Sequence, residues 1–377
     1  MLSALEPVRY LAYRAGFRHA PWLLRRAEEL GHRLRNRELE RSRFHLPGGG
    51  SRPVLELVGW DGGFVADLVR VVEDALGAPA VRSRSGVLRA AEARPALPAN
   101  ADVTLVEVPE WHAAAFSSEG WFVLPKRVTH LEPLGGDESP AARRLRRASA
   151  RAGLRFDVSR SSRHLAEFHE RLYLPMVERR HAARARPTSR ALLSLVFRDG
   201  FLVRVFERGA WVSGAVVSPH PTRAGTWSIV VTGVRDGDYA RVSETARAAA
   251  VLHARDAMMR EGATVCDHLV TRPFPEDGLF RRKRTWNTRV EDLPERPDRV
   301  ALRVNVASPA ARALLGALPF VALAPGGLAA VAWAAPESPA SRSVRRLGLP
   351  MTVVAPPEAD AEALGVFARS LARPGRR

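Results

Sequence analysis

The sequence predicts a mixed α/β fold made of at least two units. Short apolar runs rich in β-branched residues alternate with segments of helical period from about residue 50 to residue 305. The chain has 377 residues, which exceeds one average domain. Its 46% hydrophobic and 26% charged residues are ordinary for a globular protein, so packed cores are expected.

Residues 1–50 are predicted to form a basic helical extension and a linker. Aromatic and leucine side chains recur among arginines up to about residue 45. This pattern suits helices that dock on RNA or on a membrane surface, and equally helices that pack on the domain behind them. Residues 47–51 read Pro-Gly-Gly-Gly-Ser, a composition typical of linkers.

Residues 51–135 are predicted to be a small α/β unit. Residues 54–58 alternate as in a strand, and residues 63–76 repeat apolar side chains with a helical period. Further strands are expected at residues 102–108 and 121–124. A Gly-Gly-Asp sequence at residues 135–137 separates this unit from the next.

Residues 136–335 are predicted to be a second α/β unit, and residues 336–377 a Pro- and Arg-rich tail. Ser139 and Pro140 suit the N-cap and first turn of a helix over 141–152. The uncharged run 313–335 contains prolines and glycines, so short strands and turns are expected there rather than a membrane span. The other expected elements are strands at 154–158, 201–206, 211–217, 226–232 and 264–266, and helices at 162–180, 188–197 and 241–260.

The chain is strongly basic, with a formal net charge of +18 and an isoelectric point near 11.4. Nucleic acid, anionic lipid and phosphate-bearing substrates are the partners expected for such a charge, although high genomic GC content would also scatter arginines. The helix 141–152 places several arginines on adjacent turns. Arg143, Arg144 and Arg147 are the predicted nucleic-acid contacts.

Cysteine and histidine usage argues against two classes of site. One cysteine, Cys266, excludes an intramolecular disulfide framework and a Cys-rich zinc site, and it is expected to be an inert buried side chain. The eleven histidines show no metal-ligand spacing, so no metal is expected. Glu6 and Arg9 interrupt the apolar run that a signal peptide needs, so a cytoplasmic protein is expected.

One stretch, Thr264–Trp286, carries the strongest functional signal. A strand is expected to end at Asp267, and Pro273 and Pro275 then force a turn. The next residues, 279–286, form a short basic helix with four successive cations. The carboxyl end of a strand is where open α/β sheets commonly bind ligands, so an anionic or oxyanion-forming substrate is expected; a solvated surface helix is the alternative.

This stretch resembles the signature of the Fem-type branch of the GNAT acyltransferase superfamily. The matching positions are Asp267, Thr271-Arg272-Pro273-Phe274, Asp277-Gly278 and Lys283-Arg284-Thr285-Trp286. Leu269 stands where relatives often carry glycine, and Arg282 where they often carry an aromatic residue. Three strands, a long helix and a strand follow in the order of a GNAT core. The two α/β units of similar order resemble the tandem GNAT-like halves of the Fem-type enzymes, so the resemblance implies a tandem GNAT-like fold.

A second block, residues 172–181, is similar to one in the same group where a helix ends near the substrate channel. Arg179, Arg180 and His181 would then face the substrate; cations that suit a helix C-terminus are the alternative. An acyltransferase of this kind needs a free amine, an activated acyl donor and donors for the oxyanion. Lys283 and Arg284 are the predicted oxyanion donors, and Asp267 the predicted base, with Asp277 as its alternative. Arg272, Phe274, Phe280 and Trp286 are the predicted substrate contacts.

No permanently bound cofactor is expected, and the acyl donor is either aminoacyl-tRNA or acyl-CoA. Asp236 and Asp238 lie where a CoA-dependent enzyme would cradle pyrophosphate, which favours aminoacyl-tRNA, although Arg241 could pair with a phosphate. An amine acceptor is the expected partner, with tRNA and a peripheral membrane contact as further candidates. An acyl-CoA-dependent acetyltransferase of a metabolite or lipid amine, and an RNA-binding protein without activity, are the alternative functions. The acceptor and the oligomeric state are left open.

Overall fold

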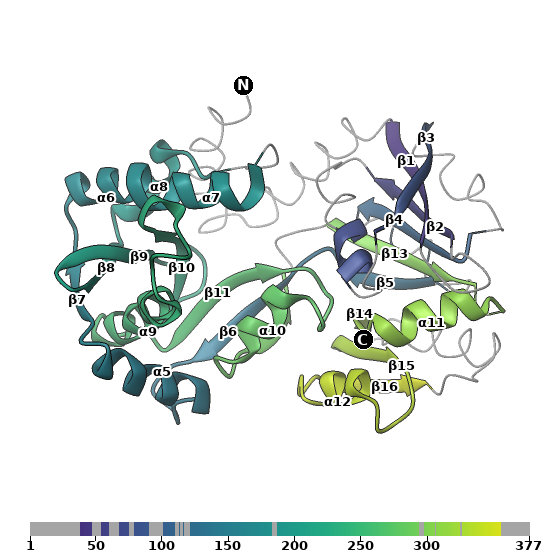
Figure 1. The fold of residues 1–377 in the computed structure, drawn as a ribbon. Helices are drawn as coiled ribbons and strands as arrows, with labels where there is room; N and C mark the ends of the chain where they lie inside the picture. Colours follow the sequence, from purple (N-terminus) through teal and green to yellow (C-terminus); the bar gives the residue numbers. More distant parts are fainter. Residues whose placement is uncertain are drawn as a thin grey trace. The chain divides into compact units, whose positions relative to one another are not determined.

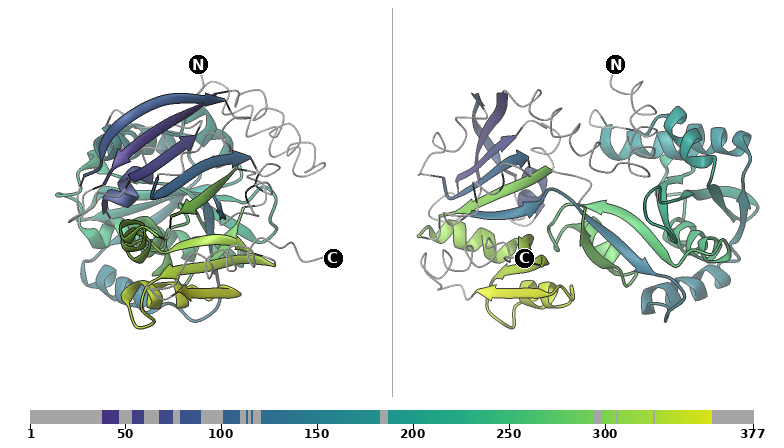
Figure 2. Two further views of the ribbon diagram at one scale, coloured as in Figure 1. Left: turned by 90° about the vertical axis from the view of Figure 1, so that its right-hand side faces the viewer. Right: turned by 180° about the vertical axis from the view of Figure 1, so that it is seen from behind.

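The computed structural model describes the chain in segments. These are residues 38–46, 54–59, 68–74, 79–89, 101–109, 113, 116, 121–182, 187–293, 298–305, 307–324 and 326–355. Within them the chain divides into two compact units that alternate along the sequence. The first unit comprises residues 130–269 and 283–288, and the second comprises the remaining described residues. Figure 1 labels their elements, and Figure 2 gives two further views.

The first unit is a mixed sheet with helices on both faces. Its strands follow one another across the sheet in the order β6, β11, β10, β9, β8, β7. They span Val128–Pro133 (β6), Arg155–Ser159 (β7), Phe201–Glu207 (β8), Ala210–Pro219 (β9), Thr226–Val234 (β10) and Val265–Thr271 (β11). Its helices are α5 (Pro140–Arg151), α6 (Ser162–Phe168), α7 (Leu174–His181), α8 (Arg190–Phe197) and α9 (Glu244–Arg260).

Two hydrophobic cores hold these layers together. On one face, side chains of α6, α7 and α8 pack on Leu202 and Val216. On the other face, α9 packs its alanines and Met258 on Phe201 and Val217, and α5 lies outside α9 (Figure 1). The adjacent strand residues 216 and 217 thus point to opposite cores, as the alternation of a strand requires. Three antiparallel strands, a long helix and a parallel strand confirm the predicted GNAT order.

The helix predicted over 162–180 is not regular. Between α6 and α7 the segment His169–Tyr173 (η3) is π-helical, and the Leu174 N–H bonds to the His169 carbonyl five residues back. Pro175 follows at the start of α7 and has no N–H of its own to donate. Gly233 allows the wide turn to approach the sheet, because a Cβ there would lie 2.8 Å from the Phe168 ring.

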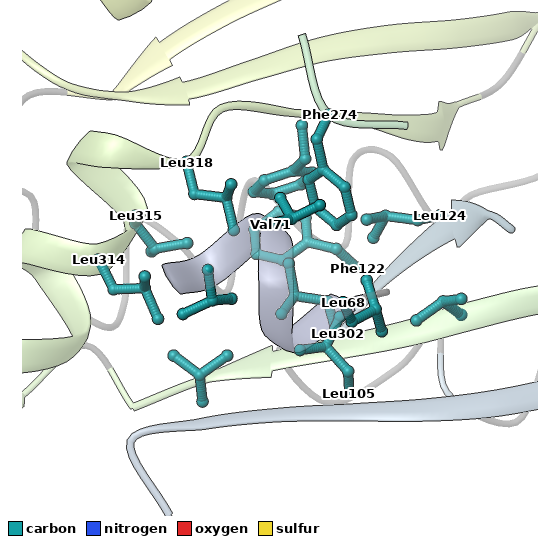
Figure 3. Packing of buried hydrophobic residues seen from close by; sticks show 14 of the residues in the cluster. Leu68, Val71, Leu105, Phe122, Leu124, Phe274, Leu302, Leu314, Leu315 and Leu318 are labelled. Atoms are coloured by element: carbon teal, nitrogen blue, oxygen red, sulfur yellow. The ribbon is translucent and has the colours of Figure 1, made fainter. Parts of the chain in front are cut away.

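The second unit contains two sheets. A six-stranded sheet has the order β3-β1-β2-β4-β13-β5, and a three-stranded sheet the order β14-β15-β16. Leu68, Phe122, Phe274 and Leu314 meet in its main core (Figure 3). The strands of these two sheets are Glu38–His45 (β1), Val54–Gly59 (β2), Val81–Arg89 (β3), Val103–Pro109 (β4), Trp121–Pro125 (β5), Asp298–Val304 (β13), Phe320–Ala324 (β14), Gly327–Trp333 (β15) and Met351–Ala355 (β16). Strand β12 (Arg289–Asp292) belongs to neither of them. The helices α11 (Pro309–Ala317) and α12 (Pro339–Arg345) also belong to the second unit, and α10 spans Gly278–Arg284.

Several predicted boundaries differ from this structure. Residues 38–45 form strand β1, which pairs with β2 and β3, so the predicted helical extension is wrong from residue 38 on; residues 1–37 lie outside the described residues. Residues 298–304 were assigned to the second α/β unit without a predicted strand; they form β13, which pairs with β4 and β5. The predicted tail contains α12 and β16, which pairs in parallel with β15. No helix in the described part of the chain is long and apolar enough to cross a bilayer.

Candidate active site

The centre of the first unit is the place where β10 and β11 part. These strands pair in parallel over three residue pairs only, from Thr226–Val265 to Ser228–Asp267. Beyond Ser228, β10 has a register irregularity between Ile229 and Val231 in its pairing with β9. Both strands continue past their last mutual pair, to Val234 and Thr271. Asp267 is therefore the last residue of β11 that is paired with β10.

Asp267 is held at this point by its neighbours. One carboxylate oxygen accepts a hydrogen bond from the Leu269 backbone N–H at 2.7 Å, and the other accepts one from Ser228 Oγ at 3.4 Å. Only 5% of Asp267 is exposed. Leu269 has a left-handed backbone with φ of 62°, a conformation that glycine adopts without strain. The strand was expected to end at Asp267; instead it bends at Leu269 and continues to Thr271.

A second, fully buried polar group lies on the other face of β11. The carboxylate of Glu132 on β6 accepts hydrogen bonds from Arg255 Nε and from His268 Nε2, both at 2.8 Å, and Arg255 Nη2 lies 2.6 Å from its second oxygen. Trp286 completes the group, with the Arg255 guanidinium 5.4 Å and the His268 ring 5.9 Å from its ring. We call Glu132, Arg255, His268 and Trp286 the Glu132 cluster.

Metal binding at this cluster is disfavoured by its own charges. Glu132, Cys266 and His268 offer ligand atoms within 4.8 Å of one another. Both oxygens of Glu132 already accept bonds from Arg255 or His268, and a metal ion would meet the guanidinium charge. Burial raises the pKa of the Cys266 thiol well above its usual value, with a further contribution from the Glu132 charge, whereas metal binding needs the thiolate. The geometry is that of an ion-pair network.

Lys283 and Arg284 lie beside His130, near this cluster. His130 is fully buried, and its Nδ1 lies 3.3 Å from Thr288 Oγ1. Burial, followed by the positive charge of Lys283, lowers the pKa of His130 to about 2, with smaller effects from His268 and Arg284. Lys283 and Arg284 are half-buried, and burial lowers the pKa of Arg284. The structure thus groups the two predicted catalytic cations with Trp286 and His130.

The neutral state of His130 predicts an acid-sensitive fold. Between pH 6.5 and pH 2 the unfolded chain binds a proton on this histidine that the folded chain rejects, so stability falls as pH falls. At pH 5.5 the loss is about 1.4 kcal/mol relative to pH 7.5. We expect His130→Gln to lose correspondingly less stability than the parent between these pH values. Denaturant unfolding at both pH values measures this, and equal pH slopes would contradict it.

The Pro-Phe-Pro elbow has a structural role in the second unit. Arg272 Nε donates to Asp277 at 2.7 Å, and the other oxygen of Asp277 accepts from the N–H of Leu279 at 2.8 Å. Asp277 therefore caps helix α10 and pairs with Arg272. These contacts favour a structural role for Asp277 over the alternative role of catalytic base. Phe274 and Phe280 are 2% and 0% exposed and lie in hydrophobic cores. They are core residues rather than groups on a binding surface.

The predicted cations of α7 are exposed at its C-terminal end. Arg179 and Arg180 face solvent, and the Arg179 charge contributes to a lowered pKa of Asp238, which places it near the loop before α9. The side chain of His181 lies outside the described residues.

The loop before α9 uses its backbone N–H groups internally. Asp238 Oδ1 accepts hydrogen bonds from the N–H groups of Ala240 and Arg241, at 3.0 and 3.1 Å. These bonds, chiefly the one from Arg241, lower the pKa of Asp238, so it carries its charge at neutral pH. Ser243 then caps the helix by accepting from the Ala246 N–H. Because a carboxylate already occupies these donors, they are not available to a pyrophosphate.

The predicted nucleic-acid contacts Arg143, Arg144 and Arg147 are exposed on α5. They lie on its outer face, while Ala142 and Ser149 are buried. They belong to the α9 side of the sheet, since α5 packs on α9.

The second unit has a surface cavity that none of the predicted site residues lines. It has a volume of about 630 Å³, lies in the second unit between α11 and the end of β15, and is lined by Pro309, Arg312, Ala313, Gly316, Trp333, Ala334 and Ala335. Its lining includes one charged side chain and no carboxylate, so it offers no acid-base pair.

Comparisons with known proteins address the fold. No family model and no curated protein matches the sequence. Solved structures include FemX, with a TM-score of 0.37 and 11% identity over 75% of this chain and 90% of that one. L-PGS from Bacillus licheniformis has a TM-score of 0.36 and 12% identity, covering 71% and 82% of the two chains. The C-terminal domain of a putative lysylphosphatidylglycerol synthetase from Agrobacterium fabrum has a TM-score of 0.34 and 14% identity, covering 73% and 84%.

The matched structures include FemX and a putative acetyltransferase of the GNAT family from Novosphingobium aromaticivorans. Both belong to the group whose signature the sequence resembles. All identities are below 15% and all TM-scores below 0.5, so the matches fix neither donor nor acceptor. The GNAT-like order of the first unit stands on its own strand pairings.

Sequence reasoning missed four members of the site region, and one of them, His268, directly follows the predicted Asp267. Glu132, Arg255 and His130 lie in stretches whose local pattern predicts only a loop or an ordinary helix. One signal was available for Arg255, because an arginine on the buried face of an alanine-rich helix needs a buried partner. The partner itself is 123 positions away in sequence, so no local pattern identifies it.

Proposed function

We propose that this chain is an N-acyltransferase that transfers an acyl or aminoacyl group to an amine acceptor. The observation that carries the proposal is the position of Asp267. It is a buried carboxylate at the residue where β11 stops pairing with β10, in a sheet with the strand order of a GNAT core. A carboxylate at that position is suited to accept a proton from an attacking amine.

The proposed reaction forms a bond between the acceptor nitrogen and the donor carbonyl carbon. Asp267 takes the proton that the amine loses, and the carbonyl oxygen becomes an oxyanion. Collapse of this intermediate breaks the bond to the leaving group, which departs as a tRNA hydroxyl or the CoA thiol after it receives the proton that Asp267 had accepted. The signature implies Lys283 and Arg284 as the oxyanion donors. Their charges act on His130, near the Glu132 cluster and not on the Asp267 face of β11, so their catalytic role stays a prediction.

Aminoacyl-tRNA is the donor class we favour. In the loop before α9, the N–H groups of Ala240 and Arg241 donate to Asp238, where an acyl-CoA enzyme would present free donors to pyrophosphate. The carboxylate charge also repels a pyrophosphate. A net charge of +18 suits a polyanionic donor.

The test incubates the full chain with a panel of amine acceptors and two labelled donors. One is a mixture of aminoacyl-tRNAs, and the other is acetyl-CoA. We expect label to pass from the aminoacyl-tRNA to an amine and not from acetyl-CoA. Transfer from acetyl-CoA alone would overturn the donor assignment, and RNA binding without transfer from either donor would support the RNA-binding alternative.

A further inference from the structure

The outer face of α5 is a stripe of arginine side chains. Arg143, Arg147 and Arg151 follow one another at intervals of four residues, and Arg144 lies beside them, so the four fall within an arc of about 100°. All four are exposed. Residues four apart on a helix are neighbours, with Cβ atoms about 6 Å apart. The first turn of α5 contains no acidic residue.

Another arginine of α5, Arg146, binds the two carboxylates Asp256 and Glu138. Arg146 donates to Asp256 at 2.7 and 2.9 Å and to Glu138 at 2.7 Å. Although burial opposes it, the bonds from Arg146 hold the pKa of Asp256 low. By contrast, the four guanidinium groups of the stripe make no hydrogen bond or ion pair with any residue that the structure describes. Their positive charge is directed to solvent.

Exposed apolar side chains lie on the same side of the sheet. Phe156 and Val158 on the edge strand β7 are 38% and 39% exposed, and Met259 near the end of α9 is 38% exposed. The Phe156 ring stacks on His253 of α9 at 3.7 Å, so this face of β7 belongs to the α9 side. We call the four arginines of the stripe with Phe156, Val158 and Met259 the arginine face.

We propose that the arginine face docks on a membrane surface that contains anionic phospholipids. Four outward guanidinium groups complement phosphate headgroups. The three apolar side chains beside the stripe favour a membrane over RNA as the partner. Two of the three are aliphatic, and one face of the Phe156 ring is already covered by His253, so they offer little for base stacking. By contrast, burying apolar side chains at the boundary of headgroups and acyl chains strengthens membrane binding, and neighbouring cations add attraction to anionic lipids. This proposal does not depend on the proposed catalytic function.

The test is sedimentation of the full chain with vesicles. We expect binding to vesicles that contain phosphatidylglycerol, much weaker binding to pure phosphatidylcholine, and loss of binding as salt is raised. The triple variant Arg143→Gln, Arg147→Gln, Arg151→Gln should bind roughly 100-fold more weakly, because each cation near an anionic surface is worth about a factor of five. The matched control changes Arg163, Arg171 and Arg198, exposed cations on or beside the helices of the opposite sheet face, to glutamine.

Equal losses in the two triple variants would overturn the proposal, because net charge alone would then explain binding. A second variant, Val158→Ser with Met259→Ser, tests the apolar part and leaves every charge in place. We expect it to weaken vesicle binding and to leave the salt dependence unchanged. Circular dichroism checks that each variant is folded. If the stripe variant loses affinity for a folded RNA while vesicle binding is unchanged, the arginine face is an RNA surface and the proposal is wrong.

Discussion

Asparagine in place of Asp267 is expected to lower the rate of acyl transfer by about 100- to 10,000-fold, the range for loss of a general base. In the parent, Asp267 Oδ1 accepts a hydrogen bond from the Leu269 N–H at 2.7 Å. The amide oxygen of asparagine can accept the same hydrogen bond, so the bend in β11 should persist. The substitution removes the charge and the ability to take a proton. Steady-state kinetics with the active donor measures the effect, and it should appear in kcat rather than in KM.

The control for this prediction is Ser228→Ala. It removes the 3.4 Å contact to the second oxygen of Asp267 but leaves the carboxylate. We expect less than about a tenfold change in rate, since a contact of 3.4 Å is longer than an ordinary O–H···O hydrogen bond and is therefore weak. An Asp267→Asn variant that retains full activity would show that Asp267 is only a backbone cap. An unfolded variant would be detected by circular dichroism before kinetics.

Alanine in place of Glu132 is expected to lower the free energy of unfolding by about 3 to 5 kcal/mol, the usual cost of removing one partner of a buried ion pair. The side chains of Glu132 and Arg255 are 3% and 7% exposed, so the guanidinium would be left in the core with Glu138 at 3.8 Å as its remaining carboxylate. His268 would lose its acceptor as well. Urea unfolding at neutral pH measures this change.

The double variant Glu132→Leu with Arg255→Met is the matched control. It removes both charges and fills the space with apolar groups, which is often neutral or stabilising for buried ion pairs. We therefore expect it to recover most of the loss seen in Glu132→Ala. If the Glu132→Ala variant were as stable as the parent, Arg255 would have found another partner. The ion pairs of the Glu132 cluster would then not be what stabilises the contact between β6, α9 and β11.

Much of the first unit follows from local sequence. Apolar and β-branched runs predict β7, β8, β9, β10 and α9 within a few residues of their observed bounds, because most of these elements pack side chains into the cores on the two faces of the sheet. Ser139 and Pro140 predict the start of α5, and Ser139 Oγ does accept the Ala142 N–H. The signature also points to Leu269, where relatives carry glycine and the backbone is left-handed.

Side-chain roles in the elbow were harder to predict. Phe274 and Phe280 look like recognition residues in the signature, but they fill cores of the second unit. Trp286 was also predicted as a substrate contact, yet it is buried, with the Arg255 guanidinium and the His268 ring against its own ring. A short basic-aromatic segment does not reveal which of its residues point inward, since burial is set by elements distant in sequence.

By itself the sequence determined the periodic elements, their order and the position of a carboxylate on the strand after the long helix. Those features depend on contacts between near neighbours or on the alternation of one strand. Only the tertiary structure decided that Glu132 meets His268 across 136 positions, and that Asp267 and His268 serve opposite faces of β11. The physical reason is that a buried charge is tolerated only beside a partner, and the partner is chosen by strand order, which no local pattern encodes.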